Sequence, residues 1–183
     1  MRSRATLLAA MLLALGGCAG VPPSAAPAAS IVNSLSFDHA MTGKRDGLRS
    51  AWPAAKLAGH VEHFPMAQVK QCNPAGACSW GVLKARRSFG KVEPVAGGVR
   101  VDVEVAIDVE RSQKAFTGGG QAAMAIPADV AALQARRSEK RAIVLEYGKV
   151  TRIDMNYGIS YELCALRLDA AGAPLDTCAI AYF

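Results

Sequence analysis

The chain of 183 residues is 51% hydrophobic and 20% charged, with 21 Lys and Arg against 15 Asp and Glu. This balance is typical of one folded domain and excludes disorder of the whole chain. The length excludes a two-domain enzyme, since domains commonly hold about 100–200 residues. The five cysteines and nine prolines fit neither a knottin nor a collagen.

The first 17 residues have the pattern of an export signal. Two arginines precede an apolar run at residues 5–15, which is shorter than the ~20 residues that a membrane-spanning helix needs. The run ends in Leu15-Gly16-Gly17-Cys18, which resembles the lipobox of bacterial lipoproteins. The resemblance implies cleavage before Cys18 and attachment of a diacylglycerol to its thiol. The alternative is an ordinary signal peptide that is cut near residues 25–29 and carries Cys18 away.

An export signal places the mature chain outside the cytoplasm. Its anionic neighbours there are lipid head groups, lipopolysaccharide, peptidoglycan and acidic proteins, and nucleic acid is not an expected partner. Loss of residues 1–17 removes two arginines and lowers the net charge from +6 to +4. Residue 19 is alanine rather than aspartate, and the resemblance to lipoproteins of enteric-type bacteria then implies the outer membrane. The lipid would anchor the chain there, with the domain in the periplasm or at the cell surface.

Residues 18–30 are predicted to form a lipidated, Ala- and Pro-rich tether. This segment carries no charge and three prolines. Its small side chains bury too little apolar area to fold, and its prolines favour an extended backbone. A single globular domain is therefore expected at residues 31–183.

Two short helices are predicted in the folded body. Residues 53–64 have apolar side chains at helical spacing and a proline directly after them, and a second helix starts near Pro127 and continues to Arg137. On the first helix, His60 and His63 would share one face and are weak candidates for binding a metal ion. If this segment is instead a strand, the two imidazoles point to opposite faces and the hypothesis fails. No cofactor is expected.

Four cysteines remain if Cys18 carries lipid, and an oxidising periplasm then allows two disulfides in any of three pairings. We expect bridges between cysteines that are neighbours in the chain: Cys72–Cys78 and Cys164–Cys178. The first closes a loop of turn-forming residues. A turn about Ala171 would place the second pair opposite each other on adjacent strands. A four-cysteine zinc site is disfavoured, because the spacings do not match those of zinc knuckles.

The clearest strand lies at residues 99–110. Apolar residues alternate there with mostly charged ones over twelve positions, which predicts an antiparallel strand with one buried and one solvated face. A glycine-containing turn precedes it, so that residues 83–109 are expected to form a long hairpin. The turn could be centred on residues 96–97 or on 97–98, and either register pairs opposite charges on the solvated face.

Further strands are expected at residues 142–147, 150–155, 159–168 and 175–182. Together with the hairpin they make at least six strands. The fold class is therefore α+β or mainly β, built on an antiparallel sheet with one or two short helices and stapled by the disulfides.

Two basic clusters are the remaining candidates for a binding site. If they converge in space, they would form a patch for an anionic ligand. Their members are Lys84, Arg86, Arg87, Arg136, Arg137, Lys140 and Arg141.

No catalytic residue is assigned, because no complete catalytic constellation stands out. We therefore expect a non-enzymatic protein-binding module at the outer membrane, either an accessory of envelope assembly or an inhibitor or immunity protein. Its expected partner is an envelope protein, with an anionic glycan or lipid as the other ligand considered. Two alternatives stay open: a subunit of a larger secretion or transport assembly, and a small envelope hydrolase that uses His60 and His63.

Overall fold

The computed structural model describes residues 28–39, 44–76, 78–111, 114–117, 120–123 and 133–180. The export signal, Cys18 and most of the predicted tether lie outside these residues. So does the first part of the predicted second helix, at residues 124–132.

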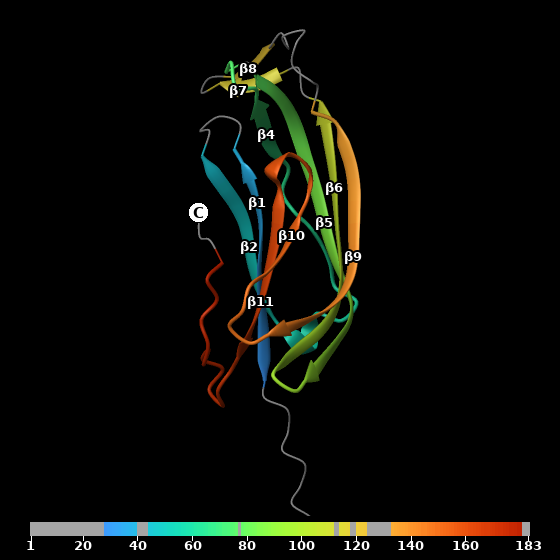
Figure 1. Cartoon of the computed structure of the whole chain (residues 1–183), viewed down its shortest axis with the longest axis vertical. Helices are drawn as coiled ribbons and strands as arrows, with labels where there is room; N and C mark the ends of the chain where they lie inside the picture. The colour runs from blue at the N-terminus through green and yellow to red at the C-terminus, as the bar shows by residue number, and fades with distance from the viewer. Residues whose placement is uncertain are drawn as a thin grey trace, which may run out of the picture.

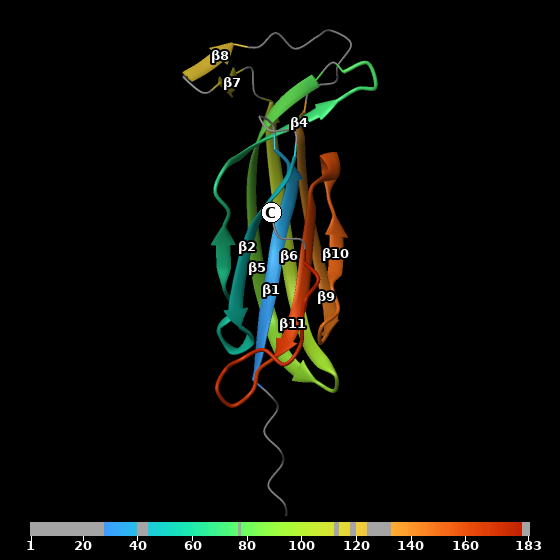
Figure 2. The same cartoon turned by 90° about the vertical axis from the view of Figure 1, so that its left-hand side faces the viewer.

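The described residues form a sandwich of two antiparallel sheets (Figures 1 and 2). In spatial order, sheet A consists of β10 (Thr151–Asp154), β11 (Ser160–Arg167), β1 (Ala29–Asp38) and β2 (Arg45–Pro53). Sheet B consists of β3 (Val61–His63), β5 (Cys78–Val95), β6 (Gly98–Arg111) and β9 (Ala135–Glu146), and β4 (Ala67–Cys72) also pairs with β5. A separate hairpin joins β7 (Lys114–Thr117) to β8 (Gly120–Ala123).

The core lies between the two sheets and follows from the alternation along each strand. Strand β6 directs its valines and Ile107 inward, where they are almost completely buried, and its charged residues outward. Sheet A contributes the inward side chains of Ile31, Leu35 and Tyr161, which are fully buried. Strand β1 is an inner strand of sheet A and pairs with both β11 and β2.

The fold is mainly β, and neither predicted helix forms in the described residues. Only two single turns of 3₁₀ helix occur there, η1 (Ala54–Lys56) and η2 (Asn156–Gly158). No helix in the described part of the chain is long and apolar enough to cross a membrane.

The helix expected at residues 53–64 is wrong because backbone hydrogen bonds to sheet B replace it. Gly59 has a φ of +75°, which ends the turn of η1. Phe64 then donates from its backbone to Ala85 of β5. Leu57 and Phe64 are buried, as the helical pattern required, but Val61 is 51% exposed.

The expected continuation of the second helix to Arg137 is also wrong, because Arg137 lies in strand β9. Twelve residues of β9 pair with β6, from Ala135 opposite Val109 to Glu146 opposite Gly98. Pairing with the free edge of a long buried strand stabilises the extended form over a short isolated helix.

The long hairpin at residues 83–109 is confirmed, and its turn is centred on residues 96–97. Val95 lies opposite Gly98 and Glu93 opposite Arg100, and Gly97 takes a φ of +77°. A Cβ at Gly98 would lie 2.2 Å from the carbonyl oxygen of Leu145, so this position requires glycine. The register then shifts by one residue between Phe89 and Val92. This β-bulge changes which side chains of β5 face the solvent.

The strands expected in the last third of the sequence are confirmed except the final one. Residues 142–147 match the end of β9, and residues 150–155 match β10. These two strands belong to different sheets, and the chain crosses from one sheet to the other at Gly148. Strand β11 covers most of residues 159–168. The described part of 175–182 forms no strand. It runs as irregular chain over the outer face of sheet A, where Ile180 packs against Val32.

Both expected disulfides are present in the structure. Cys72 and Cys78 lie opposite each other at the junction of β4 and β5. Cys164 of β11 joins Cys178, with a Cα–Cα distance of 6.0 Å. The sequence predicted that this second bridge joins two adjacent strands, but Cys178 does not lie in a strand. It holds the irregular C-terminal segment against sheet A.

Candidate functional site: the outer face of sheet B

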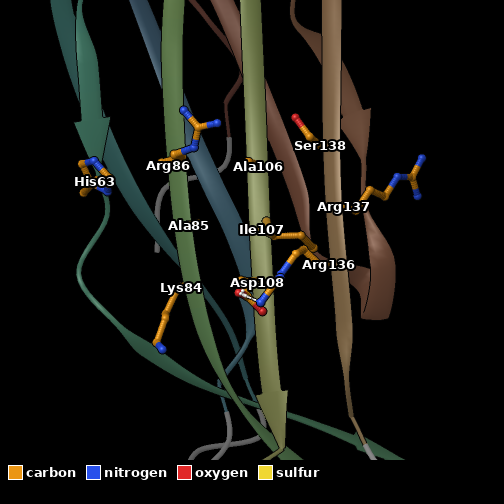
Figure 3. Close-up of a pocket in the computed structure, with 10 residues that line it drawn as sticks. All are labelled: His63, Lys84, Ala85, Arg86, Ala106, Ile107, Asp108, Arg136, Arg137 and Ser138. Carbon is orange, nitrogen blue, oxygen red and sulfur yellow. Dashed lines mark hydrogen bonds and ion pairs between the residues drawn. The ribbon is translucent and has the colours of Figure 1, made fainter.

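Part of the two basic clusters converges on the outer face of sheet B. Strands β5, β6 and β9 lie side by side there and surround an open depression of about 410 Å³ (Figure 3). We call it the Ala106 depression. Its lining residues are His63, Lys84, Ala85, Arg86, Ala106, Ile107, Asp108, Arg136, Arg137 and Ser138.

The depression exists because a small residue lies between longer ones. In the register of the sheet, Ala106 of β6 lies between Arg86 of β5 and Ser138 of β9. Directly opposed residues on antiparallel strands share a face, so all three side chains point outward. The methyl group of Ala106 leaves a low point in this row, and the side chains around it form the walls.

Each cation at the depression is paired with a carboxylate of the same face. Lys84 pairs with Glu110 across 2.8 Å, and Arg86 pairs with Glu104 across 3.0 Å. Arg136 lies 2.9 Å from Asp108, a contact drawn in Figure 3, although its own side chain is 83% exposed. Exposed ion pairs contribute about 0–1 kcal/mol, so these cations can exchange an internal carboxylate for an external one at little cost.

Of the other predicted members of the patch, Arg137 lines the depression and Arg141 does not. They lie opposite Ile107 and Val103, whose side chains face the interior, and so they point to the inner side of edge strand β9. Figure 3 shows Arg137 directed away from the depression. Both arginines form ion pairs with Glu139, and the hydrogen bond from Arg137 is the main cause that lowers the pKa of this carboxyl group. Lys140 stays on the outer face, opposite Glu104.

Arg87 is the clearest departure from the predicted patch, because it is fully buried between the sheets. Its guanidinium donates to the hydroxyl groups of Tyr161 and Ser50 over 3.1 and 2.7 Å and forms an ion pair with Glu62. The ring of Phe89 lies 5.3 Å from its central carbon. Arg87 therefore joins sheet B to sheet A.

The β-bulge explains why the sequence placed Arg87 on the wrong face. A regular hairpin with its turn at residues 96–97 would set Arg87 opposite Ala106, on the solvated side. The one-residue shift at Phe89 sets it opposite Val105 instead, on the core side. Leu83, Arg87 and Phe89 occupy alternate positions of β5, so the two apolar residues indicated that Arg87 also faces the core. The charge of Arg87 argued against that interpretation.

The two candidate metal ligands, His60 and His63, are not brought together. The ring of His60 packs on Trp52 with a centroid distance of 4.7 Å, whereas His63 is exposed at the rim of the Ala106 depression. His60 directly precedes strand β3, and residues three apart in extended chain point to opposite faces. In the part of the chain that the structure describes, no group of three or more His, Cys, Asp or Glu residues could hold a metal ion.

The Ala106 depression thus offers exposed cations, carboxylates and a serine hydroxyl on a rigid sheet. No protein-family model matches the chain, and no curated protein or solved structure does. The function of the protein is therefore inferred from the predicted export signal and from this surface. A surface of this kind can bind a polar partner through hydrogen bonds and exchanged ion pairs.

Proposed function

We propose that this protein is a lipid-anchored protein of the bacterial outer membrane that binds an envelope protein, without catalysis, through the outer face of sheet B. The observation that carries the proposal is the convergence of Lys84 and Arg86 with Arg136 around Ala106. These residues are far apart in the sequence, and the pairing of β5, β6 and β9 brings them to one surface.

The shape and charge of this surface favour a protein as the partner. The depression is open, and charges of both signs alternate across it, because each cation has a carboxylate beside it. A polyanion would meet repulsion from Glu104, Asp108 and Glu110 as well as attraction. A protein loop with acidic and basic groups can match both signs, and arginine is enriched in such interfaces.

The anchor in this proposal is the diacylglycerol that the Leu-Gly-Gly-Cys motif implies at Cys18. Strand β1 begins at Ala29, so the folded domain starts eleven residues after that cysteine. A tether of this length keeps the domain near the membrane surface and limits its partners to the cell envelope. The two disulfides suit an oxidising compartment of this kind.

Site-specific photo-crosslinking in cells that produce the full chain tests the proposal. A photo-reactive amino acid is placed at Ala106 and, as a control, at Ala51 on the outer face of sheet A. We expect a discrete crosslinked protein from position 106 and none from position 51. Equal products from both positions, or crosslinks from position 106 to glycan or lipid alone, would contradict a protein-binding face.

A matched pair of charge reversals sharpens this experiment. The double variant Lys84→Glu/Arg136→Glu changes the Ala106 depression, whereas Lys149→Glu/Arg152→Glu makes the same change in net charge away from it. Only the first variant is expected to lose the crosslinked product. Loss in both would indicate a general effect of net charge.

A further inference from the structure

A second depression lies at the end of the sandwich where β1 begins. It has a volume of about 300 Å³, and its lining contains no polar side chain. We call it the base pocket. Its lining residues are Ala28, Ala29, Pro53, Ala54, Ala55, Val92, Pro94, Val99 and Leu168. Figure 2 shows this end of the molecule, with the start of β1 close to the turn of the β5–β6 hairpin.

Small side chains and the hairpin bulge create the base pocket. Four of its lining residues are alanines, which leave space at the start of β1 and along η1. Val99 is buried at 1% exposure and lies opposite Pro94, and Val92 directly follows the register shift of β5. Since the side chains offer no hydrogen-bond donor or acceptor, the pocket suits a hydrocarbon rather than a polar ligand.

The first two described residues lie at this pocket. Ala28 and Ala29 form part of its wall, and the backbone of Leu168 donates a 2.8 Å hydrogen bond to the carbonyl of Ala28. This bond holds the start of the domain at the rim. Ala28 is ten residues after Cys18, and a chain of that length spans at most about 33–36 Å. A lipid on Cys18 is therefore held within reach of the base pocket at all times.

We infer that the base pocket binds one acyl chain of the lipid carried by Cys18. The inference rests on the lipid anchor of the proposed function. The volume of the pocket is at the lower end of the range for ligand sites, about 300–1,000 Å³, so it accommodates part of one chain and not two chains. The short tether keeps the lipid close to the pocket, which favours binding of its own chain over a free fatty acid.

Binding of one acyl chain would weaken the membrane anchor. Two acyl chains hold a protein firmly in a bilayer, whereas one chain gives weak and reversible attachment. When the base pocket takes up one chain of the lipid, fewer chains remain in the membrane and the attachment weakens. The pocket thereby stabilises the intermediate through which the protein leaves one membrane and enters another.

Transfer of the purified lipidated protein between vesicles tests this inference. Donor and acceptor vesicles contain phosphatidylethanolamine and phosphatidylglycerol, and the transfer rate is measured for wild type and for Ala55→Phe. Ala55 is exposed at the pocket, so a phenylalanine there blocks the pocket without entering the core. The matched control is Ala171→Phe, in an exposed turn outside the pocket. We expect several-fold slower transfer for Ala55→Phe alone, and equal rates would overturn the inference.

A crosslinking measurement shows where the acyl chain lies. Cells are fed a photo-reactive fatty acid that is incorporated into lipoproteins, and the irradiated protein is digested and analysed by mass spectrometry. We expect crosslinks from the acyl chain to residues 53–55 and 92–99, lost in Ala55→Phe. A chain with labelled lipid but without these crosslinks would contradict the base pocket only. An intact mass without lipid would contradict the anchor itself, and the inference with it.

Discussion

The Nη1 atom of Arg87 lies 3.1 Å from the hydroxyl oxygen of Tyr161, and this hydrogen bond joins the two sheets inside the sandwich. Both side chains are fully buried. The charge of Arg87 is balanced by Glu62 of β3, and Ser50 of β2 accepts a further hydrogen bond. A buried cation of this kind requires its partners, because leaving it unpaired costs far more than an exposed ion pair contributes.

Removal of the carboxylate at Glu62 should therefore destabilise the fold. For Glu62→Gln we expect a loss of about 2–3 kcal/mol in the free energy of unfolding, since the Glu62 side chain is 28% exposed and water can replace part of the interaction. Urea unfolding with intact disulfides measures this loss. The control is Glu93→Gln, which breaks an exposed ion pair with Lys91 and should cost less than about 1 kcal/mol. Similar losses for both variants would contradict the role of Arg87 as a buried, paired cation.

Removal of the hydroxyl group of Tyr161 should have a smaller effect and a distinct pH dependence. Burial raises the pKa of Tyr161 to about 12, despite the opposing effect of Arg87. The unfolded state loses this proton near pH 10, so stability from this group is complete below pH 10 and is lost as the pH rises towards 12. We expect Tyr161→Phe to cost about 1–2 kcal/mol at pH 7. Its stability should also fall less steeply than that of wild type between pH 10 and 12, and parallel curves would refute this assignment.

The ion pair between Arg167 and Asp176 should govern part of the acid stability. Arg167 donates hydrogen bonds from both its side chain and its backbone to the Asp176 carboxylate, which lowers the pKa of that group to about 2. The stabilisation is present above the unfolded pKa, near 4, and is lost as the pH falls towards 2. We expect Asp176→Asn to lower the melting temperature at pH 7 and to flatten its decrease between pH 4 and 2. Arg167→Gln should reproduce both effects, and an unchanged acid profile would argue against the pair.

The disulfide between Cys164 and Cys178 should contribute more stability than the one between Cys72 and Cys78. Its loop spans 14 residues rather than 6, and closing a loop of this length stabilises a fold by about 3 kcal/mol in the chain-entropy description. We compare the double alanine variants of the two pairs by urea unfolding.

Limited proteolysis of the same two variants locates the effect. The cystine holds the C-terminal segment, in which Ile180 packs on Val32, against the outer face of sheet A. New cleavage after residue 168 is therefore expected only when Cys164 and Cys178 are replaced. Protection of this segment in that variant would show that packing alone holds it.

Features that depend on neighbours in the chain were predictable. The strict alternation at residues 99–110 predicted β6, and the glycines beside it predicted the hairpin turn. The close spacing of the cysteines predicted both disulfides. The faces of Lys84 and Arg86 were not predictable in this way, because a regular hairpin would set Arg86 opposite the inward-facing Ile107, and only the bulge at Phe89 turns both side chains to the solvent. Nothing local showed that Arg136 would lie across β6 from them.

Features that depend on distant partners were decided by the tertiary structure. The segment at 53–64 and the residues up to Arg137 have patterns compatible with helix, but sheet B provides hydrogen-bond partners and a buried face that the isolated segments lack. The final segment, at 175–182, alternates like a strand. In its described part it remains irregular, held by Cys178 and the packing of Ile180.

Arg87 shows why some features were predictable from the sequence and others were decided by the tertiary structure. The residues around Arg87 in the sequence predicted that it lies on a strand, and its charge predicted that its side chain faces the solvent. A one-residue bulge at Phe89 turned it inward, and three other strands supply Glu62, Ser50 and Tyr161 as partners. Strand periodicity is encoded locally, every second residue, but the choice of face depends on register. Register is set by the energy of packing and hydrogen bonding against residues that are distant in the sequence.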